Sequence, residues 1–394
     1  MNAGSIGSSH SFTSAGVDIM LLDSRSGFPV VADRPRSSPI LRFNAAVLKK
    51  DLAKARDNLS AVVLRDNHLW LGGDEGTSID RMTRDAGGNF GDHSRFELKD
   101  LLKLPASAKE EIDIEGLDVD GGYLWAIGSH SAKRKKAESD KSPAENLERL
   151  GKVEMEGNRF TLARVPLNAN AEPVAKHHSL TAARLGGNAR GNLLTDALKN
   201  DHHLGRFVPR KSSDDSVDGI PSKDNGFDVE GLAVSGNRVF LGLRGPVLRG
   251  WAVVIELRIS ASSGDVLSLD PLGPAGEPYV KHFLQLDGLG VRELSIRDND
   301  LLILAGPSMD LDGPVFIYRW KKALESKVES LTVREELNKV VTVPFGDKTD
   351  HAEGLTIVTR TPLSVLVSYD SPHPSRLDGA DGSGVSADIF DVTL

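Results

Sequence analysis

The chain has 394 residues, which is long enough for two ordinary domains or for one large repetitive domain. Its formal net charge of −8 argues against a nucleic-acid-binding surface, and the lack of cysteine excludes disulfides and thiolate metal sites. No stretch approaches the roughly eighteen apolar residues of a membrane span, and the first residues lack the features of a signal peptide. We therefore expect a protein without membrane contact that is cytoplasmic, or periplasmic or secreted if a signal peptide was removed.

Residues 1–37 are rich in Gly, Ser and Pro, which predicts a flexible N-terminal leader. Residues 38–394 are expected to form a single domain. Within it, residues 39–48 read as a strand that belongs to no repeat and is free to complete a sheet elsewhere.

One pattern then recurs five times: a short alternating strand, a turn of Asp, Asn, Gly or Pro, and a more apolar second strand. In the first four copies a large apolar residue follows in the second strand, and we expect it to pack between neighbouring sheets. The copies cover residues 58–76, 113–131, 228–245, 290–308 and 351–371, and the apolar residues are Trp70, Trp125, Phe240 and Leu302.

The copies repeat about every 60 residues, except for one gap of about twice that length, which indicates a large insertion at about 130–225. Within the insertion, residues 130–152 read as a charged loop, 161–167 as a strand, 191–201 as a helix and 208–226 as a loop. Later strands are expected over residues 251–259, 279–286, 314–320, 339–345 and 386–394.

These elements predict an all-β fold, a β-propeller, in which strands from both termini close the ring and leave no exposed sheet edges. The number of copies favours five blades. Six blades is the alternative, because the long gap spans about two repeats.

When the five copies are aligned, one position near the head of each first strand holds Ser60, Glu115, Glu230, Arg292 or Glu353. In a propeller these positions converge around the central channel, and we call them the ring residues. Glycine follows each of the three glutamates, as expected where a side chain would collide with the neighbouring blade.

Three converging carboxylates repel one another unless a cation offsets their charge. Glu115, Glu230 and Glu353 are therefore predicted either to be catalytic acid/base groups or to bind a metal, namely Ca²⁺ or another divalent cation, which prefers oxygen ligands. The alternative is a salt-bridged, water-filled plug around Arg292 that only seals the channel.

Loops on the same face collect further charged groups that suit a small anionic ligand. We expect this ligand to contact Asp74, Glu75, Lys223, Arg244, Arg292 and Asp370, and we expect His130 to be catalytic. The alternative for His130 is a hydrogen-bonded loop residue.

The stretches "IPSKDNGFDVEGLAV" and "LRGPVLRGWAVVIEL", together with the other copies of the pattern, resemble the bacterial family called domain of unknown function 3616. The resemblance covers about residues 58–371 and implies a propeller-like fold, without implying an activity. The Glu-Gly-Leu strand heads are more distantly similar to phytase-like esterase and metal-dependent lactonase propellers, in which the strand-head Glu binds a divalent ion. This sequence departs from them by placing Ser60 and Arg292 among the ring residues.

Two functions follow from these observations. The first is a hydrolase of an anionic small molecule or phosphoester, of esterase, phosphoesterase or lactonase type and assisted by a divalent metal. The second is a non-enzymatic binding or scaffold propeller with a structural channel, whose protein partner the sequence does not identify.

Overall fold

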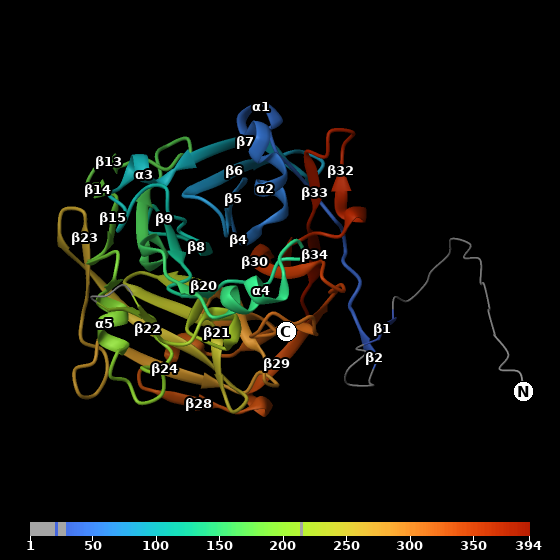
Figure 1. Ribbon diagram of the computed structural model, residues 1–394. Coiled ribbons are helices and arrows are strands. Elements are labelled where there is room, and N and C mark those ends of the chain that lie inside the picture. The colour runs from blue at the N-terminus through green and yellow to red at the C-terminus, as the bar shows by residue number, and fades with distance from the viewer. Residues whose placement is uncertain (1–19, 23–28, 213–215) are drawn as a thin grey trace, which may run out of the picture.

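The protein is a β-propeller, as predicted (Figure 1). The computed structural model describes residues 20–22, 29–212 and 216–394. Five inner strands surround the centre, and each is the first strand of one sequence repeat: β4 (Leu59–Arg65), β8 (Ile114–Asp120), β20 (Asp228–Ser235), β25 (Gly290–Arg297) and β30 (His351–Arg360). Each packs against the next in this order, and β30 packs against β4, so the inner strands form a closed ring.

A second strand pairs antiparallel with each inner strand, as the repeated pattern predicts. These are β5 (His68–Gly73), β9 (Tyr123–Gly128), β21 (Arg238–Leu248), β26 (Asp300–Gly306) and β31 (Leu363–Asp370). The strands farther out are β6 (Ser78–Arg84), β7 (Phe90–Glu97), β12 (Leu162–Pro166), β15 (Ala183–Leu185), β22 (Trp251–Ser263), β24 (Tyr279–Leu284), β27 (Val315–Trp320), β29 (Leu337–Val343) and β34 (Asp388–Asp391).

One strand joins the sheets of two repeats, and another pairs with a strand outside its own repeat. The strand β23 (Val266–Leu269) pairs with β22 and, in parallel, with β15, while β28 (Ser330–Thr332) pairs in parallel with β24. The closed ring of five inner strands agrees with the preference for five blades. Because the sheets are joined, the blade count itself stays a prediction.

Segments from both ends of the chain meet in the outer sheets. Ser37 bridges to Ile389 in β34, and β3 (Ile40–Arg42) pairs with β33 (Gly384–Ser386) and with β7.

The expectation of one strand over 39–48 is wrong beyond Arg42. The Asn44 side chain accepts hydrogen bonds from two backbone N–H groups and begins the helix α1 (Ala45–Leu48), which leads through η1 (Lys49–Asp51) into α2 (Leu52–Asp57).

Much of the predicted leader lies outside the described residues, namely 1–19 and 23–28. The part that is described contains β1 (Met20–Leu22), paired with β2 (Pro29–Val31). Asp33 is bound to the propeller, because its N–H donates to the Thr342 carbonyl at 2.8 Å and its carboxylate accepts from the Thr342 N–H at 2.7 Å. The end of the predicted leader is therefore part of the fold.

The insertion contains more regular structure than the sequence predicted. Its strand over 161–167 and its helix over 191–201 are confirmed as β12 and α5 (Leu193–Leu198). The expected loop over 130–152 instead holds α4 (Pro143–Leu150), flanked by the paired strands β10 (Lys133–Arg134) and β11 (Val153–Glu154). A capping box between Ser142 and Glu145, with Pro143 in the first turn, explains why this polar segment is helical.

Short elements complete the connections. They are α3 (Leu98–Leu101), η2 (Gly157–Phe160), η3 (Ser222–Asp224), η4 (Ala323–Glu325), η5 (Arg334–Glu336), η6 (Pro374–Arg376), β13 (Lys176–His177), β14 (Leu180–Thr181), β16 (Gly187–Asn188), β17 (Gly191–Asn192), β18 (Arg210–Lys211), β19 (Val217–Asp218) and β32 (Leu377–Asp378). Among the described residues, no helix is long and apolar enough to cross a membrane.

The core lies between neighbouring sheets, where the four predicted apolar residues, Trp70, Trp125, Phe240 and Leu302, are all buried. The glycines after the ring glutamates are required by close packing. A Cβ atom on Gly116 would lie 2.6 Å from the Leu232 Cβ of the next inner strand, and one on Gly231 would lie 2.9 Å from the Leu294 Cγ. This confirms that the glycine lets adjacent inner strands approach each other.

Candidate functional site

Every inner strand carries an irregularity at its ring residue. The pairing register shifts between Leu59 and Ala61, Ile114 and Gly116, Val229 and Gly231, Val291 and Glu293, and Ala352 and Gly354. The ring residue is therefore the extra residue of a β-bulge in all five strands, and a bulge can turn a side chain out of the regular alternation.

A cavity of about 860 Å³ lies at the heads of the inner strands, and we call it the axial cavity. Charged residues dominate its lining, with carboxylates and arginines near the ring and lysines from the surrounding loops. The lining includes Asp74, Glu75, Asp113, Glu115, Lys133, Lys136, Arg149, Arg159, Lys223, Asp228, Arg244, Arg292, Met309, Asp310, Leu311, Asp312, Lys348, His351, Glu353 and Asp370.

Glu230 holds the centre of an ion-pair network beneath this cavity. Its carboxylate accepts hydrogen bonds from Arg244 at 2.6 Å and from Arg292 at 2.9 Å, and it is only 2% exposed. Arg292 also reaches Glu353 at 3.0 Å, and Arg244 lies 3.7 Å from Asp228. The predicted salt-bridged arrangement around Arg292 thus exists on one side of the ring, and both carboxylate oxygens of Glu230 already accept hydrogen bonds from arginine.

A second buried pair joins Asp113 to Arg159 at 2.5 Å. Arg159 also donates to the Ser131 hydroxyl at 3.1 Å and to the Ser129 hydroxyl at 3.3 Å. The short element η2 of the insertion delivers this arginine to the cavity. Nothing in the repeated pattern indicates it, so this residue is not among those predicted from the sequence.

The other side of the ring has carboxylates without such partners. Ligand oxygens of Asp74, Glu115 and Glu353 lie within 4.8 Å of one another, and we call these three residues the carboxylate triad. One oxygen of Asp74 is buried and makes no hydrogen bond with the described residues, and among them no hydrogen bond or ion pair is found for Glu115, which is 9% exposed. Within the part of the chain that the structure describes, Glu353 is the one member of the triad that forms an ion pair, with Arg292.

Burial and mutual repulsion make these carboxyls hard to ionise. Burial, together with the charges of Asp113 and Glu230, raises the pKa of Glu115 well above its ordinary value. Burial and the neighbouring Glu353 do the same to the pKa of Asp74. Burial also raises the pKa of Glu353 to about 7, although Arg292 opposes the shift.

His351 at the head of β30 connects the ring to an adjacent loop. Its Nδ1 lies 3.5 Å from the Asp370 carboxylate and its Nε2 lies 3.2 Å from that of Asp312. The hydrogen bond with Asp370 is the largest cause of the raised pKa of His351. A protonated imidazole can donate to both carboxylates at once, whereas a neutral one can donate to only one.

Lysines surround the opening of the axial cavity. Lys223 forms a long ion pair with Asp310 at 3.6 Å, and Lys133 pairs with Glu156 at 3.3 Å. Lys136 and Lys348 are exposed, and within the described part of the chain no ion pair is found for either. The opening therefore presents these two lysines above a floor of carboxylates.

The structure brings together most of the predicted site residues. Those that line the axial cavity are Asp74, Glu75, Glu115, Lys223, Arg244, Arg292, Glu353 and Asp370. Glu230 lies just outside the lining. In the carboxylate triad, Asp74 occupies the position that was predicted for Glu230. Ser60 donates a hydrogen bond to the Ile114 carbonyl at 2.5 Å and so links two inner strands.

His130 is separate from the other predicted residues, and the expectation that it acts beside them is corrected. Its imidazole is completely buried, with Nδ1 donating to the Gly128 carbonyl and Nε2 accepting from the Asn192 amide, both at 2.7 Å. Burial lowers the pKa of His130 to about 4. It is a neutral structural group that ties β9 to the insertion, as its alternative interpretation held.

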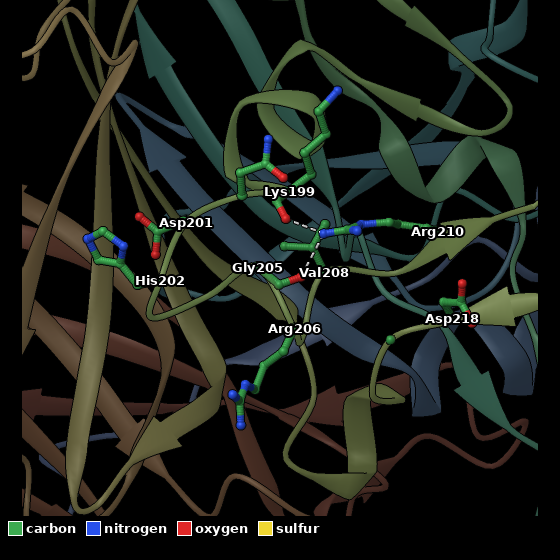
Figure 2. A pocket seen from close by; sticks show the side chains of 10 residues that line it. Lys199, Asp201, His202, Gly205, Arg206, Val208, Arg210 and Asp218 are labelled. Atoms are coloured by element: carbon green, nitrogen blue, oxygen red, sulfur yellow. Dashed lines mark hydrogen bonds between the residues drawn. The ribbon is translucent and has the colours of Figure 1, made fainter.

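A second cavity of about 360 Å³ lies in the insertion (Figure 2). Arg210 occupies one side of it and donates to the backbone carbonyls of Lys199 and Gly205. The side chains of Lys199, His202 and Arg206 point in different directions in Figure 2. Because no set of functional groups converges there, the axial cavity is the better candidate.

The family model described as "Protein of unknown function (DUF3616)" matches residues 58–388. No curated protein matches the chain.

Several solved structures are similar to most of the chain, at low identity. Glutaminyl cyclase from Myxococcus xanthus is 9% identical with a TM-score of 0.36, covering 86% of this chain and 93% of its own. A GH43 β-1,3-galactosidase with galactodeoxynojirimycin is 7% identical with a TM-score of 0.41, covering 86% and 91%. A putative 6-phosphogluconolactonase from Bacteroides fragilis is 11% identical with a TM-score of 0.30, covering 84% of each chain. At this level of similarity, their activities are no guide to that of this chain.

Proposed function

The chain belongs to the family of proteins of unknown function DUF3616, and from the geometry of its axial cavity we propose that it is a hydrolase of anionic small molecules that uses a divalent cation. Ca²⁺ is the cation we expect, held by the carboxylate triad of Asp74, Glu115 and Glu353. Asp74 thus replaces Glu230, which was predicted from the sequence to be a metal ligand.

The observation that supports this proposal is the spacing of the triad. Calcium binds oxygens at roughly 2.3–2.6 Å, so two oxygens that share one ion lie at most about 5 Å apart. The triad oxygens lie within 4.8 Å of one another, which fits this limit. Among the residues that the structure describes, Asp74 and Glu115 form no ion pair, so their oxygens are free to act as ligands.

The electrostatics of the site favour a cation for the same reason. Buried carboxylates that repel one another must either take up protons or gain positive charge. In the protein alone, the raised pKa values of Asp74 and Glu115 favour the uptake of protons. A divalent ion would supply the positive charge instead, and its binding is then expected to displace protons.

A bound divalent cation would polarise an ester or phosphoryl oxygen and stabilise the charge that develops on it. The protein itself supplies the groups around that position. Arg159, Arg244 and Arg292 hold the remaining carboxylates in place, and Lys136 and Lys348 attract an anionic ligand at the opening. Burial raises the pKa of Asp228, which lines the cavity, to about 7, so this carboxyl is suited to transfer protons near neutral pH.

A second candidate function is a non-enzymatic binding or scaffold propeller. The network of Glu230, Arg244, Arg292 and Glu353 favours it, because these residues neutralise one another without any ligand. In that case the axial cavity would bind an anion or a partner without turning it over.

Cation titrations separate these functions. Calcium, magnesium and manganese are added to the wild type and to Asp74→Asn, Glu115→Gln and Glu148→Gln, and thermal unfolding and calorimetric binding are measured. We expect calcium to stabilise the wild type and the Glu148→Gln control, whose exposed native side chain pairs with Lys152 away from the axial cavity, but not the two triad variants. The absence of any cation effect on the wild type would refute the metal site.

Substrates are then screened with the same proteins. Aryl phosphomonoesters, phosphodiesters, carboxylic esters and lactones are offered with and without the cation that binds. The proposed function predicts cation-dependent turnover that Glu115→Gln abolishes. Cation binding without turnover of any class would favour the binding propeller.

A further inference from the structure

We propose that the ligand of the axial cavity is amphiphilic, with an anionic head inside the cavity and an apolar chain lying against Met309 and Leu311. This rests on the proposed function only for the anionic head. The apolar contact is argued from the loop between β26 and β27, which no part of the proposed mechanism uses.

Met309 and Leu311 are large apolar residues that remain 43% and 46% exposed. Single exposed apolar residues are common on protein surfaces and need no explanation. These two, however, lie on one tight turn, in which the Leu311 N–H donates to the Met309 carbonyl at 2.8 Å, and both line the axial cavity. They form an apolar edge on a cavity whose other walls are charged.

The position of this turn is set by polar contacts on both sides. Asp310 pairs with Lys223, while Asp312 accepts from the Lys348 N–H at 3.1 Å and contacts His351 at 3.2 Å. At its start, the Ser308 carbonyl accepts from Arg244 at 3.2 Å. Asp310 and Asp312 thus have partners within the protein. Met309 and Leu311, which alternate with them along the chain, remain at the opening.

This combination restricts the chemical class of the ligand. A fully polar anion would satisfy the lysines at the opening and leave Met309 and Leu311 in water. A neutral apolar molecule would leave the charged floor without a partner. An anion with an alkyl or acyl chain matches both surfaces, and unbranched, polarisable Met adapts to chains of differing shape.

The experiment uses ethyl phosphate and octyl phosphate as probes, below the micelle concentration of octyl phosphate, with and without calcium. Binding to the full chain is measured by calorimetry. We expect octyl phosphate to bind the wild type about tenfold more tightly than ethyl phosphate, which corresponds to about 1.4 kcal/mol. Met309→Ser combined with Leu311→Ser should remove most of this difference and leave ethyl phosphate binding unchanged.

The matched control is Val328→Ser combined with Leu331→Ser, because these residues are also exposed and apolar but do not line the axial cavity. The control should retain the full preference for octyl phosphate. Equal binding of the two probes by the wild type, no binding of either, or equal loss of the preference in both double variants would overturn the proposal. Light scattering tests whether a second copy of the chain covers the turn instead. If the wild type is a dimer and only the Met309/Leu311 variant is monomeric, the turn is a dimer contact and the amphiphile proposal is overturned.

The two proposals fail in different ways. If octyl phosphate is preferred but calcium changes neither affinity, the amphiphile proposal stands and the cation-dependent function falls. If calcium strengthens the binding of ethyl phosphate and chain length has no effect, the function stands and the amphiphile proposal falls.

Discussion

Arg292 reaches Glu230 on the neighbouring inner strand, with its guanidinium 2.9 Å from both carboxylate oxygens. The two residues occupy equivalent positions in adjacent repeats, so the fold places an arginine directly beside the glutamate that it neutralises. As a result, one side of the ring is internally paired, and the other side, with Asp74 and Glu115, is left to bind something else.

Replacement of Glu230 by Gln should destabilise the protein without removing its cation site. The change leaves Arg244 and Arg292 buried with one negative partner fewer, and breaking a buried pair in this way costs about 3–5 kcal/mol. The free energy of unfolding is measured by urea denaturation, and cation binding by calorimetry. Glu148→Gln, which breaks the exposed pair with Lys152, is the control and should leave the free energy of unfolding almost unchanged, because water screens an exposed ion pair. Loss of calcium binding in Glu230→Gln at temperatures where it is folded would restore Glu230 as a ligand.

Replacement of Gly116 by Ala should test the close approach of the inner strands. The added Cβ would lie 2.6 Å from the Leu232 Cβ and 3.0 Å from the Leu232 backbone nitrogen, so one strand must shift. Overpacking of this kind costs about 1–3 kcal/mol, measured as a change in the free energy of unfolding. Gly91→Ala is the matched control, because a Cβ there meets no atom within 4 Å. Similar stability of both variants would contradict the packing argument.

His130 should make the protein less stable as the pH falls. Its pKa is about 4 in the folded protein and about 6.5 in the unfolded chain, so below pH 6.5 the unfolded state binds the proton first. This contribution is fully present above pH 6.5, declines through the window from pH 6.5 to 4, and amounts to about 3 kcal/mol. The measurement is the free energy of unfolding across this window in the wild type and in His130→Gln.

The His130→Gln variant should show a flatter pH dependence than the wild type, while His202→Gln, which alters an exposed histidine, should follow the wild type. Parallel curves for the wild type and His130→Gln would show that His130 does not titrate differently in the two states.

Much of the fold follows from local sequence. The five repeats, the apolar second strands with Trp70 and Trp125, and the helix α5 are all recognisable because they depend on residues close together in the chain. The helix α4 could also have been predicted from Ser142, Pro143 and Glu145, which form its N-terminal cap. The many charged residues of that segment led to the prediction of a loop instead. The break after Arg42 likewise depends on the cap formed by Asn44, which has no counterpart in the strand pattern.

The repeats alone predict which positions converge on the axis, because repeated strands place equivalent residues at equivalent heights, and they predict close packing at the glycines after Glu115 and Glu230. The ionic state of each side chain depends instead on the three-dimensional fold. Arg159 arrives from the insertion, Asp74 joins the triad from a loop, and His130 turns into the core. Such pairings depend on distances between segments far apart in the chain, and electrostatic interactions act through those distances rather than along the sequence.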